Sequence, residues 1–233
     1  MLTKGKEGGE LKINDMKKGL IFVLFALVSI VSYSQLSWNA KVGMNMSNFT
    51  GDAFKDSKMR IGFNVGVGAE YQFTEMWSIQ PSLMFTQKGT KMEESEEGIT
   101  ATAKLNPMYL EIPVLAAARF AIADNQNIVV KAGPYFAFGI AGKWKTDIEG
   151  DLGGISVEDV LDYLDIPKEA DLFGSGEDQM DMKRFDFGIG VGVAYEINKF
   201  FVSLDGEFGL TKLVDGDGAP KNMNFSIGVG YKF

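Results

Sequence analysis

Apolar and polar residues alternate with a period of two through the last twelve positions of the chain. From Asn222 to Phe233, apolar or aromatic residues occupy the odd positions, and polar residues, glycine or lysine occupy the even ones. Successive side chains of a β-strand point to opposite faces, so this pattern predicts a strand with one apolar and one polar face.

The same alternation predicts seven further strands, over residues 38–46, 60–73, 77–85, 108–120, 128–144, 184–197 and 200–211. Pro81 interrupts the third of them and requires a gap in its hydrogen-bond ladder. Short joins at 74–76, 121–127 and 198–199 alternate with longer ones at 47–59, 88–107, 145–183 and 212–221. Short periplasmic turns, longer outside loops and an even number of antiparallel strands are typical of outer-membrane barrels. We therefore predict an all-β fold, an eight-stranded antiparallel up-and-down transmembrane β-barrel over residues 36–233.

The last strand also resembles the terminal strand of bacterial outer-membrane β-barrels, through Phe225, Ile227, Val229, Tyr231 and Phe233. In that family the barrel-assembly machinery reads this strand, so the resemblance implies that these five residues form an assembly signal and that the machinery is a partner. Together with the stretch Tyr-Leu-Glu-Ile-Pro-Val at 109–114, the chain is most similar to the small PorT-like barrels. The resemblance spans about Leu36 to Phe233 and implies an integral protein of the bacterial outer membrane.

The amino end has the layout of a secretory signal. Lys17 and Lys18 precede an apolar run at 19–31, and small residues, Ser32 and Ser34, follow it. We predict a signal peptide over residues 16–34 for export by the Sec pathway, with cleavage after Ser34, and an over-extended gene start over residues 1–15. A membrane anchor is the alternative, but the run is short for a span of about 20 residues. No cysteine stands at the cleavage site, which excludes a lipoprotein anchor.

Periodicity alone does not say whether the apolar face points to lipid or to a core, since a soluble lipocalin-like barrel has the same alternation inverted. Glycines are frequent on the polar faces, for example at 188, 190 and 192. They weaken a solvent-exposed strand but leave room inside a narrow barrel. Aromatic residues gather near the short turns, as in an interfacial girdle: Trp38, Tyr71, Phe73, Trp77, Tyr195, Phe200 and Tyr231. Both features favour an apolar face that contacts outer-membrane lipid.

The polar faces carry charges of both signs, which predicts a paired interior network of Lys41, Arg60, Glu70, Glu111, Arg119, Lys131, Arg184, Asp186, Glu196, Asp205, Glu207 and Lys232. An eight-stranded barrel is just wide enough for side chains to fill it, so we expect no diffusion pore. We expect Lys41 and Glu70 to lie near each other, as a structural ion pair or, alternatively, as part of a proton or ion path.

The amino-acid composition excludes most kinds of catalytic site. The chain has no cysteine and no histidine, which excludes thiol nucleophiles, imidazole bases and the usual zinc ligands. We predict no enzymatic activity, no cofactor and no metal site. The net charge of −8 argues against nucleic acid as a partner.

Three stretches resemble binding motifs, but structural roles explain them better. Glycines at 188, 190 and 192 are no nucleotide loop, because strand alternation continues after them. Asp215 and Asp217 open a calcium-loop pattern that lacks its closing glutamate, so a turn is predicted. The acidic join at 145–183, with a capping box at 156–159 that predicts a short helix to Leu164, is expected to be a solvated outside loop. Divalent-cation binding there is the alternative.

Three functions stay open. The first is a structural or surface-interaction protein whose acidic outside loops contact an unknown surface or envelope protein. The second, which the resemblance implies, is an accessory component of a secretion or envelope-assembly complex. The third is a small-solute or ion channel.

Overall fold

The computed structural model describes residues 35–51, 54, 56–96, 99–150, 168–174 and 180–233. The predicted gene start at 1–15, the signal peptide at 16–34 and the helix at 156–164 lie outside the described residues. The barrel belongs to one unit of the chain, Ser37–Phe233.

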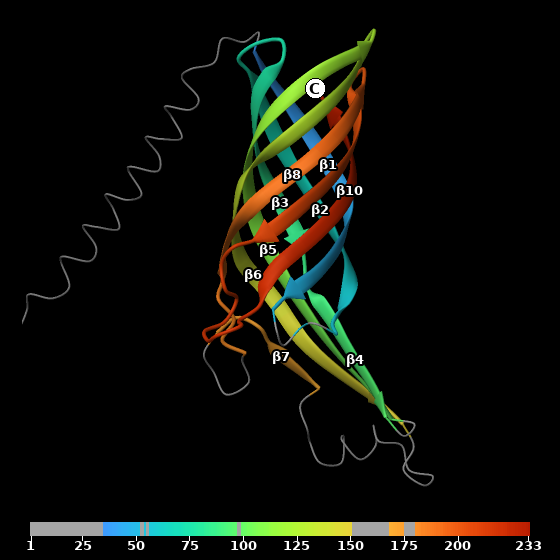
Figure 1. Ribbon diagram of the computed structural model, residues 1–233, viewed down its shortest axis with the longest axis vertical. Helices are drawn as coiled ribbons and strands as arrows, with labels where there is room; N and C mark the ends of the chain where they lie inside the picture. Colours follow the sequence, from blue (N-terminus) through green and yellow to red (C-terminus); the bar gives the residue numbers. More distant parts are fainter. Residues whose placement is uncertain (1–34, 52–53, 55, 97–98, 151–167, 175–179) are drawn as a thin grey trace, which may run out of the picture. The chain divides into compact units, whose positions relative to one another are not determined.

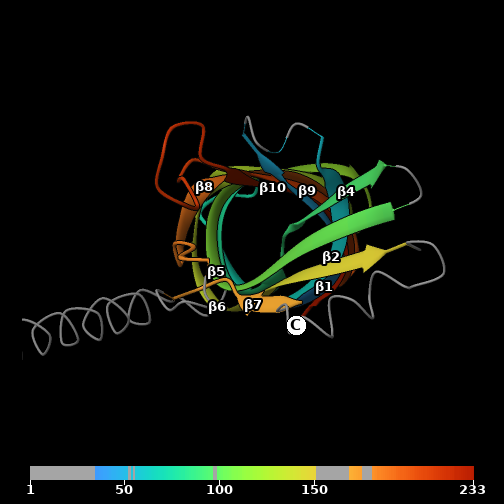
Figure 2. The same cartoon turned by 90° about the horizontal axis from the view of Figure 1, so that it is seen from below.

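Ten strands form the described part of this unit: β1 (Leu36–Thr50), β2 (Lys58–Gln72), β3 (Trp77–Gln87), β4 (Thr90–Glu96), β5 (Ile99–Ala123), β6 (Gln126–Glu149), β7 (Glu169–Asp171), β8 (Phe185–Ile197), β9 (Phe200–Gly209) and β10 (Lys221–Lys232). Among these, eight close into a ring in the order β1–β2–β3–β5–β6–β8–β9–β10 (Figure 2). The ring confirms the predicted eight-stranded antiparallel barrel. No helix of the described residues is long and apolar enough to cross a membrane.

The terminal strand closes the ring. Strand β10 pairs with β1 from Asn39 opposite Lys232 to Thr50 opposite Lys221, and with β9 along its other edge. Both edges of β10 are therefore hydrogen-bonded, so the ring has no open strand edge at β10.

The two faces of the strands lie as predicted, with the apolar set outside. Val42 and Val229 are each 53% exposed on neighbouring strands, whereas Asn45 and Asn224, of the opposite parity, are buried. An apolar exterior around a polar, filled interior is the arrangement of a barrel in lipid and the reverse of a lipocalin-like barrel.

Two of the predicted loops contain strands. Strand β5 begins at Ile99 rather than at 108, β6 continues to Glu149, and β4 and β7 pair with their outer parts. The prediction of a join over 88–107 was wrong because β4 consists mostly of charged and polar residues and the start of β5 alternates Thr with Ala, so neither shows much hydrophobic contrast. Pro81 lies in a gap of the ladder between β3 and β2, as its missing N–H requires, and in the ladder with β5 it pairs with Val114 next to a second gap.

These extra strands form what we call the projecting sheet: β4, the outer parts of β5 (99–105) and β6 (144–149), and β7. It continues beyond the barrel ring, at the end opposite the short turns (Figure 1). In outer-membrane barrels the short turns lie at the periplasmic end, and the projecting sheet lies at the opposite end, with the longer connections.

Candidate functional site

Ion pairs gather at three levels of the barrel interior. The turn-side centre consists of Glu70, Arg119, Glu196 and Lys232, the middle centre of Lys41, Lys131 and Asp205, and the loop-side centre of Lys88, Glu111, Asp186 and Glu207. The structure thus brings together ten of the twelve residues that the sequence places inside, and it adds Lys88.

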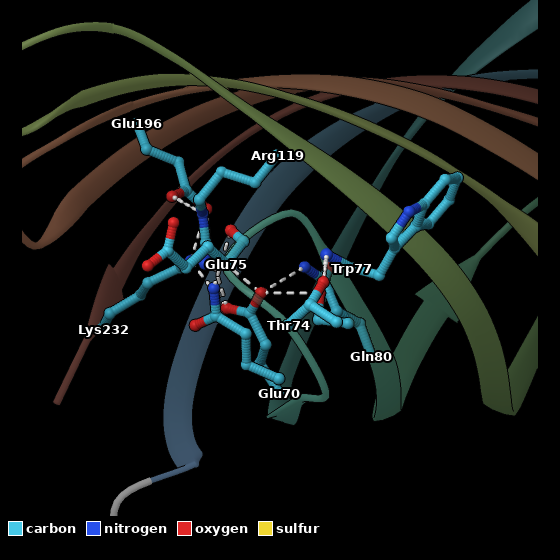
Figure 3. Close-up of polar contacts among 10 residues, drawn as sticks. Glu70, Thr74, Glu75, Trp77, Gln80, Arg119, Glu196 and Lys232 are labelled. Atoms are coloured by element: carbon cyan, nitrogen blue, oxygen red, sulfur yellow. Dashed lines mark hydrogen bonds and ion pairs between the residues drawn. The ribbon is translucent and has the colours of Figure 1, made fainter.

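The turn-side centre is a closed set of two cations and two carboxylates (Figure 3). Arg119 Nη2 lies 2.9 Å from Glu70 Oε1, and its Nε lies 3.1 Å from Glu196 Oε2. Lys232 Nζ lies 2.8 Å from Glu70 Oε2 and also pairs with Glu196. Since each carboxylate contacts both cations, this centre is electrically balanced and ties four strands together.

The middle centre has two lysines on one carboxylate. Lys41 Nζ lies 2.5 Å from Asp205 Oδ2 and Lys131 Nζ lies 2.8 Å from Oδ1. The expected pairing of Lys41 with Glu70 was wrong. Parity places both side chains in the lumen, but the stagger of the strands brings Lys41 level with Asp205 and leaves Glu70 with Arg119 and Lys232.

The loop-side centre is built around a lysine that sequence reasoning missed. Lys88 follows β3 in the stretch predicted as a join, yet its side chain is fully buried. Its Nζ lies 2.6 Å from Glu111 Oε2, 2.9 Å from Glu207 Oε2 and 4.4 Å from the centroid of the Tyr135 ring. The chain turns inward next to Gly89, whose φ of 142° suits glycine. Apolar and polar residues do not alternate around Lys88, so no pattern in the sequence indicates that its side chain lies inside the barrel.

The two other predicted interior residues lie outside these centres. Arg60 is half-buried, and its Nη1 donates to the Lys88 carbonyl at 3.4 Å. Arg184 is exposed, donates to the Gly139 carbonyl at 2.9 Å, and lies over the Phe173 ring.

A hydrophobic cluster covers the loop-side centre: Phe49, Leu105, Tyr109, Tyr135, Ala137, Leu172, Phe173, Met182 and Leu213. Leu172, Phe173 and Met182 lie in the connection between β7 and β8, and Leu213 lies between β9 and β10. Between this cluster and the turn-side centre lies a cavity of about 80 Å³, lined by residues of all three ion-pair centres. The side chains of the lumen therefore leave room for several water molecules but not for a wide channel.

The projecting sheet has two different faces. On one face Met92 and Trp144 pack against the hydrophobic cluster. The other face carries exposed or half-exposed ion pairs, including Lys104 Nζ to Asp147 Oδ2 at 2.8 Å. Hydrogen bonds from Lys91 and Lys58 hold the pKa of the Glu93 carboxyl at about 2. In the described pairings β4 meets β2 only at Thr90 and Lys91, so the rest of its outer edge faces away from the barrel.

The five residues of the predicted assembly signal lie on the exterior of the barrel: Phe225, Ile227, Val229, Tyr231 and Phe233. The Phe233 N–H donates to the Trp38 carbonyl at 2.9 Å. The Tyr231 ring lies 5.0 Å from Phe200 and 5.6 Å from Phe233, centroid to centroid. These aromatic contacts cluster at the end with the short turns.

A closed ring with an apolar exterior, a charged and filled interior and unequal ends defines the class of outer-membrane β-barrels. Residues 29–215 match the family model described as outer membrane protein beta-barrel domain. The chain belongs to this family and is an integral protein of the bacterial outer membrane.

Several solved barrels are similar to the chain. Ail of Yersinia pestis is 20% identical over 85% of this chain and 99% of its own, with a TM-score of 0.42. Neisserial surface protein A is 14% identical over 84% and 97%, with a TM-score of 0.40. OprG of Pseudomonas aeruginosa is 10% identical over 84% and 95%, with a TM-score of 0.37. No curated protein is significantly similar in sequence.

Proposed function

We propose that this protein has a surface-interaction role, with the barrel as a closed membrane anchor and the projecting sheet as the surface that contacts a protein partner outside the cell. The observation that carries the proposal is the continuation of β5 and β6, with β4 and β7 beside them, beyond the barrel ring. An anchor alone needs strands of only about 9–11 residues, and β5 has 25.

The exposed edge of β4 supports recognition of a protein chain. An unpaired edge offers backbone donors and acceptors to an extended segment of a partner. The sequence of β4 holds three glutamates and one lysine, and this net negative charge opposes pairing with a second copy of the same edge. A partner segment with basic side chains fits this edge best.

The narrow, ion-paired lumen supports an anchor rather than a channel. The turn-side centre joins four strands through its ion pairs, and the hydrophobic cluster covers the other end. In planar bilayers we expect the wild-type protein to be silent. A steady conductance from the folded barrel would favour the channel instead.

Site-specific photocrosslinking in intact cells tests the surface role. A crosslinking amino acid at Thr102, on the polar face of the projecting sheet, should give a discrete adduct with a protein. The same amino acid at lipid-facing Val65 should not. The protein that carries the crosslinking amino acid at Thr102 should still show heat-modifiable migration on a gel, which establishes that a missing adduct is not due to unfolding. Absence of an adduct from Thr102 in the folded protein refutes the surface role.

The same experiment addresses a role in a secretion or envelope-assembly complex, to which the PorT-like resemblance points. A crosslinker at Asp124, in the short turn between β5 and β6, reports on periplasmic contacts. Adducts from Asp124 alone would favour that role over the surface role. That the chain belongs to the PorT-like group stays a prediction, and so does the signal peptide at 16–34.

We also propose that the protein is not an enzyme. Support comes from the chain's lack of histidine and cysteine and from the ion pairs that hold most of the interior carboxylates. Whether the acidic stretch at 145–183 binds a divalent cation stays a prediction, since most of it lies outside the described residues.

A further inference from the structure

Two side chains of a connection are buried at the loop-side end of the barrel. Leu172 and Phe173 directly follow β7, and they are 0% and 6% exposed. Connections between strands usually run over the surface of a protein and leave their side chains in solvent. Leu172 and Phe173 instead form a cover over the end of the barrel, which we call the lid.

Strand β6 leaves space for the lid at two glycines. A Cβ at Gly139 would overlap the Phe173 ring, and a Cβ at Gly142 would lie 3.0 Å from Leu172 Cδ1. The Leu172 N–H donates to the Gly142 carbonyl at 3.0 Å. The two side chains of the lid thus occupy the space that the missing side chains of β6 leave, and the two glycines form their seat.

The lid shields the loop-side centre from water. The Phe173 ring packs edge-on against the Tyr109 ring, with 6.0 Å between the centroids, and the centroid of the Tyr109 ring lies 5.9 Å from Lys88 Nζ. Tyr109 and Lys88 are both fully buried. Ion pairs are stronger where water is excluded, because water screens the charges. Removal of the lid would therefore change the environment of the whole loop-side centre.

Apart from these two buried side chains, the lid is weakly attached. Strand β7 has three residues and pairs only with β6 among the described strands. The ion pairs of Glu169 with Lys143 and Lys145 join side chains that are 45–52% exposed, and exposed pairs are worth about 1 kcal/mol or less. Each strand of the ring, by contrast, is paired along both edges. Segments with few buried contacts and exposed hydrogen bonds open before the rest of a protein unfolds.

We propose that the lid opens while the ring stays folded, so that the loop-side end of the barrel has a closed and an open state. In the closed state Leu172 and Phe173 lie on their glycine seat and keep water from the loop-side centre. In the open state β7 detaches from β6, and water reaches the hydrophobic cluster and the ion pairs below it. This device does not depend on the partner proposed for the projecting sheet.

Cysteine labelling measures the opening, because the chain has no cysteine of its own. One protein carries Ala137→Cys, at a position that is 2% exposed and belongs to the hydrophobic cluster under the lid. A second carries Ala117→Cys, at a position that is 1% exposed and belongs to a separate buried cluster of the ring. Each folded barrel, checked by heat-modifiable migration, is treated with a charged, water-soluble maleimide. Ala137→Cys should be labelled faster than Ala117→Cys, and equal or slower labelling overturns the proposal.

Two variants unseat the lid by different routes. Phe173→Ala removes the buried ring, and Gly139→Ala adds a methyl group where that ring lies. Each should raise the labelling rate of Ala137→Cys about 10- to 100-fold, the factor expected from losing the burial of one phenylalanine side chain, and leave the rate of Ala117→Cys unchanged. Gly190→Ala on β8 is the matched control, because its Cβ would meet no atom closer than 3.5 Å, and it should change neither rate. The proposal is overturned if both lid variants leave the rate of Ala137→Cys unchanged, or if they raise both rates together.

Discussion

Replacing Lys88 with methionine removes the single cation of the loop-side centre and keeps a side chain of similar length. Lys88 makes two ion pairs, at 2.6 and 2.9 Å, and its ammonium lies over the Tyr135 ring. Its side chain has no exposed surface, so water cannot take over these contacts without rearrangement.

The expected loss of stability is large for a single substitution. Breaking a buried ion pair by removing one partner costs about 3–5 kcal/mol, because the other charge stays buried without compensation. The interaction of the ammonium with an aromatic ring is worth up to about 2 kcal/mol when desolvated, and it overlaps with the first cost. For a protein of this size, 3–5 kcal/mol lowers the unfolding midpoint by about 6–20 °C.

Heat-modifiable migration of the refolded protein measures this midpoint. Lys104→Met is the matched control, because the Lys104 side chain is 40% exposed and pairs with Asp147 on the projecting sheet. An exposed pair is worth about 1 kcal/mol or less, so the control should shift the midpoint by less than about 4 °C. Equal shifts for the two variants would refute the assignment of Lys88 as the central charge of a desolvated site.

Three further predictions concern the terminal strand, the packed lumen and the projecting sheet. Deleting Phe233 should lower the yield of assembled barrel in cells while protein refolded in detergent stays heat-modifiable; normal yield in cells would remove its role as an assembly signal. Gly230→Val should destabilise the barrel, because a Cβ at this position collides with the Phe201 ring, and the double variant with Phe201→Ala should recover part of the lost midpoint. In an NMR titration Glu93 should show a pKa of about 2, so its ion pair persists until the pH falls through that value, and Lys91→Met should raise that pKa.

The sequence could predict which segments form strands and which face of each strand points inside, because both depend on a local pattern of apolar and polar residues. Alternation with period two predicted all eight barrel strands and which face of each strand points inside, since parity alone decides the face of a strand. Parity placed Glu111 and Asp205 in the lumen before any pairing was known. It also placed Phe225 and Tyr231 on the exterior.

Which charged side chains form ion pairs with each other inside the lumen could not be predicted in the same way. Which charges meet depends on the stagger between strands, a property of the closed ring rather than of any one segment. For this reason Lys41 pairs with Asp205 rather than with Glu70.

The sequence by itself determined the barrel class, the even strand count, the outward apolar face and the mixed charge of the interior, because each follows from a repeating local pattern. Only the tertiary structure decided that Lys88 turns into the lumen and that β4 extends the sheet beyond the barrel. Burial of Lys88 requires carboxylates from β5 and β9 together, and β4 is stable only when paired with β5. Such contacts join residues far apart in the chain and leave no period in the sequence.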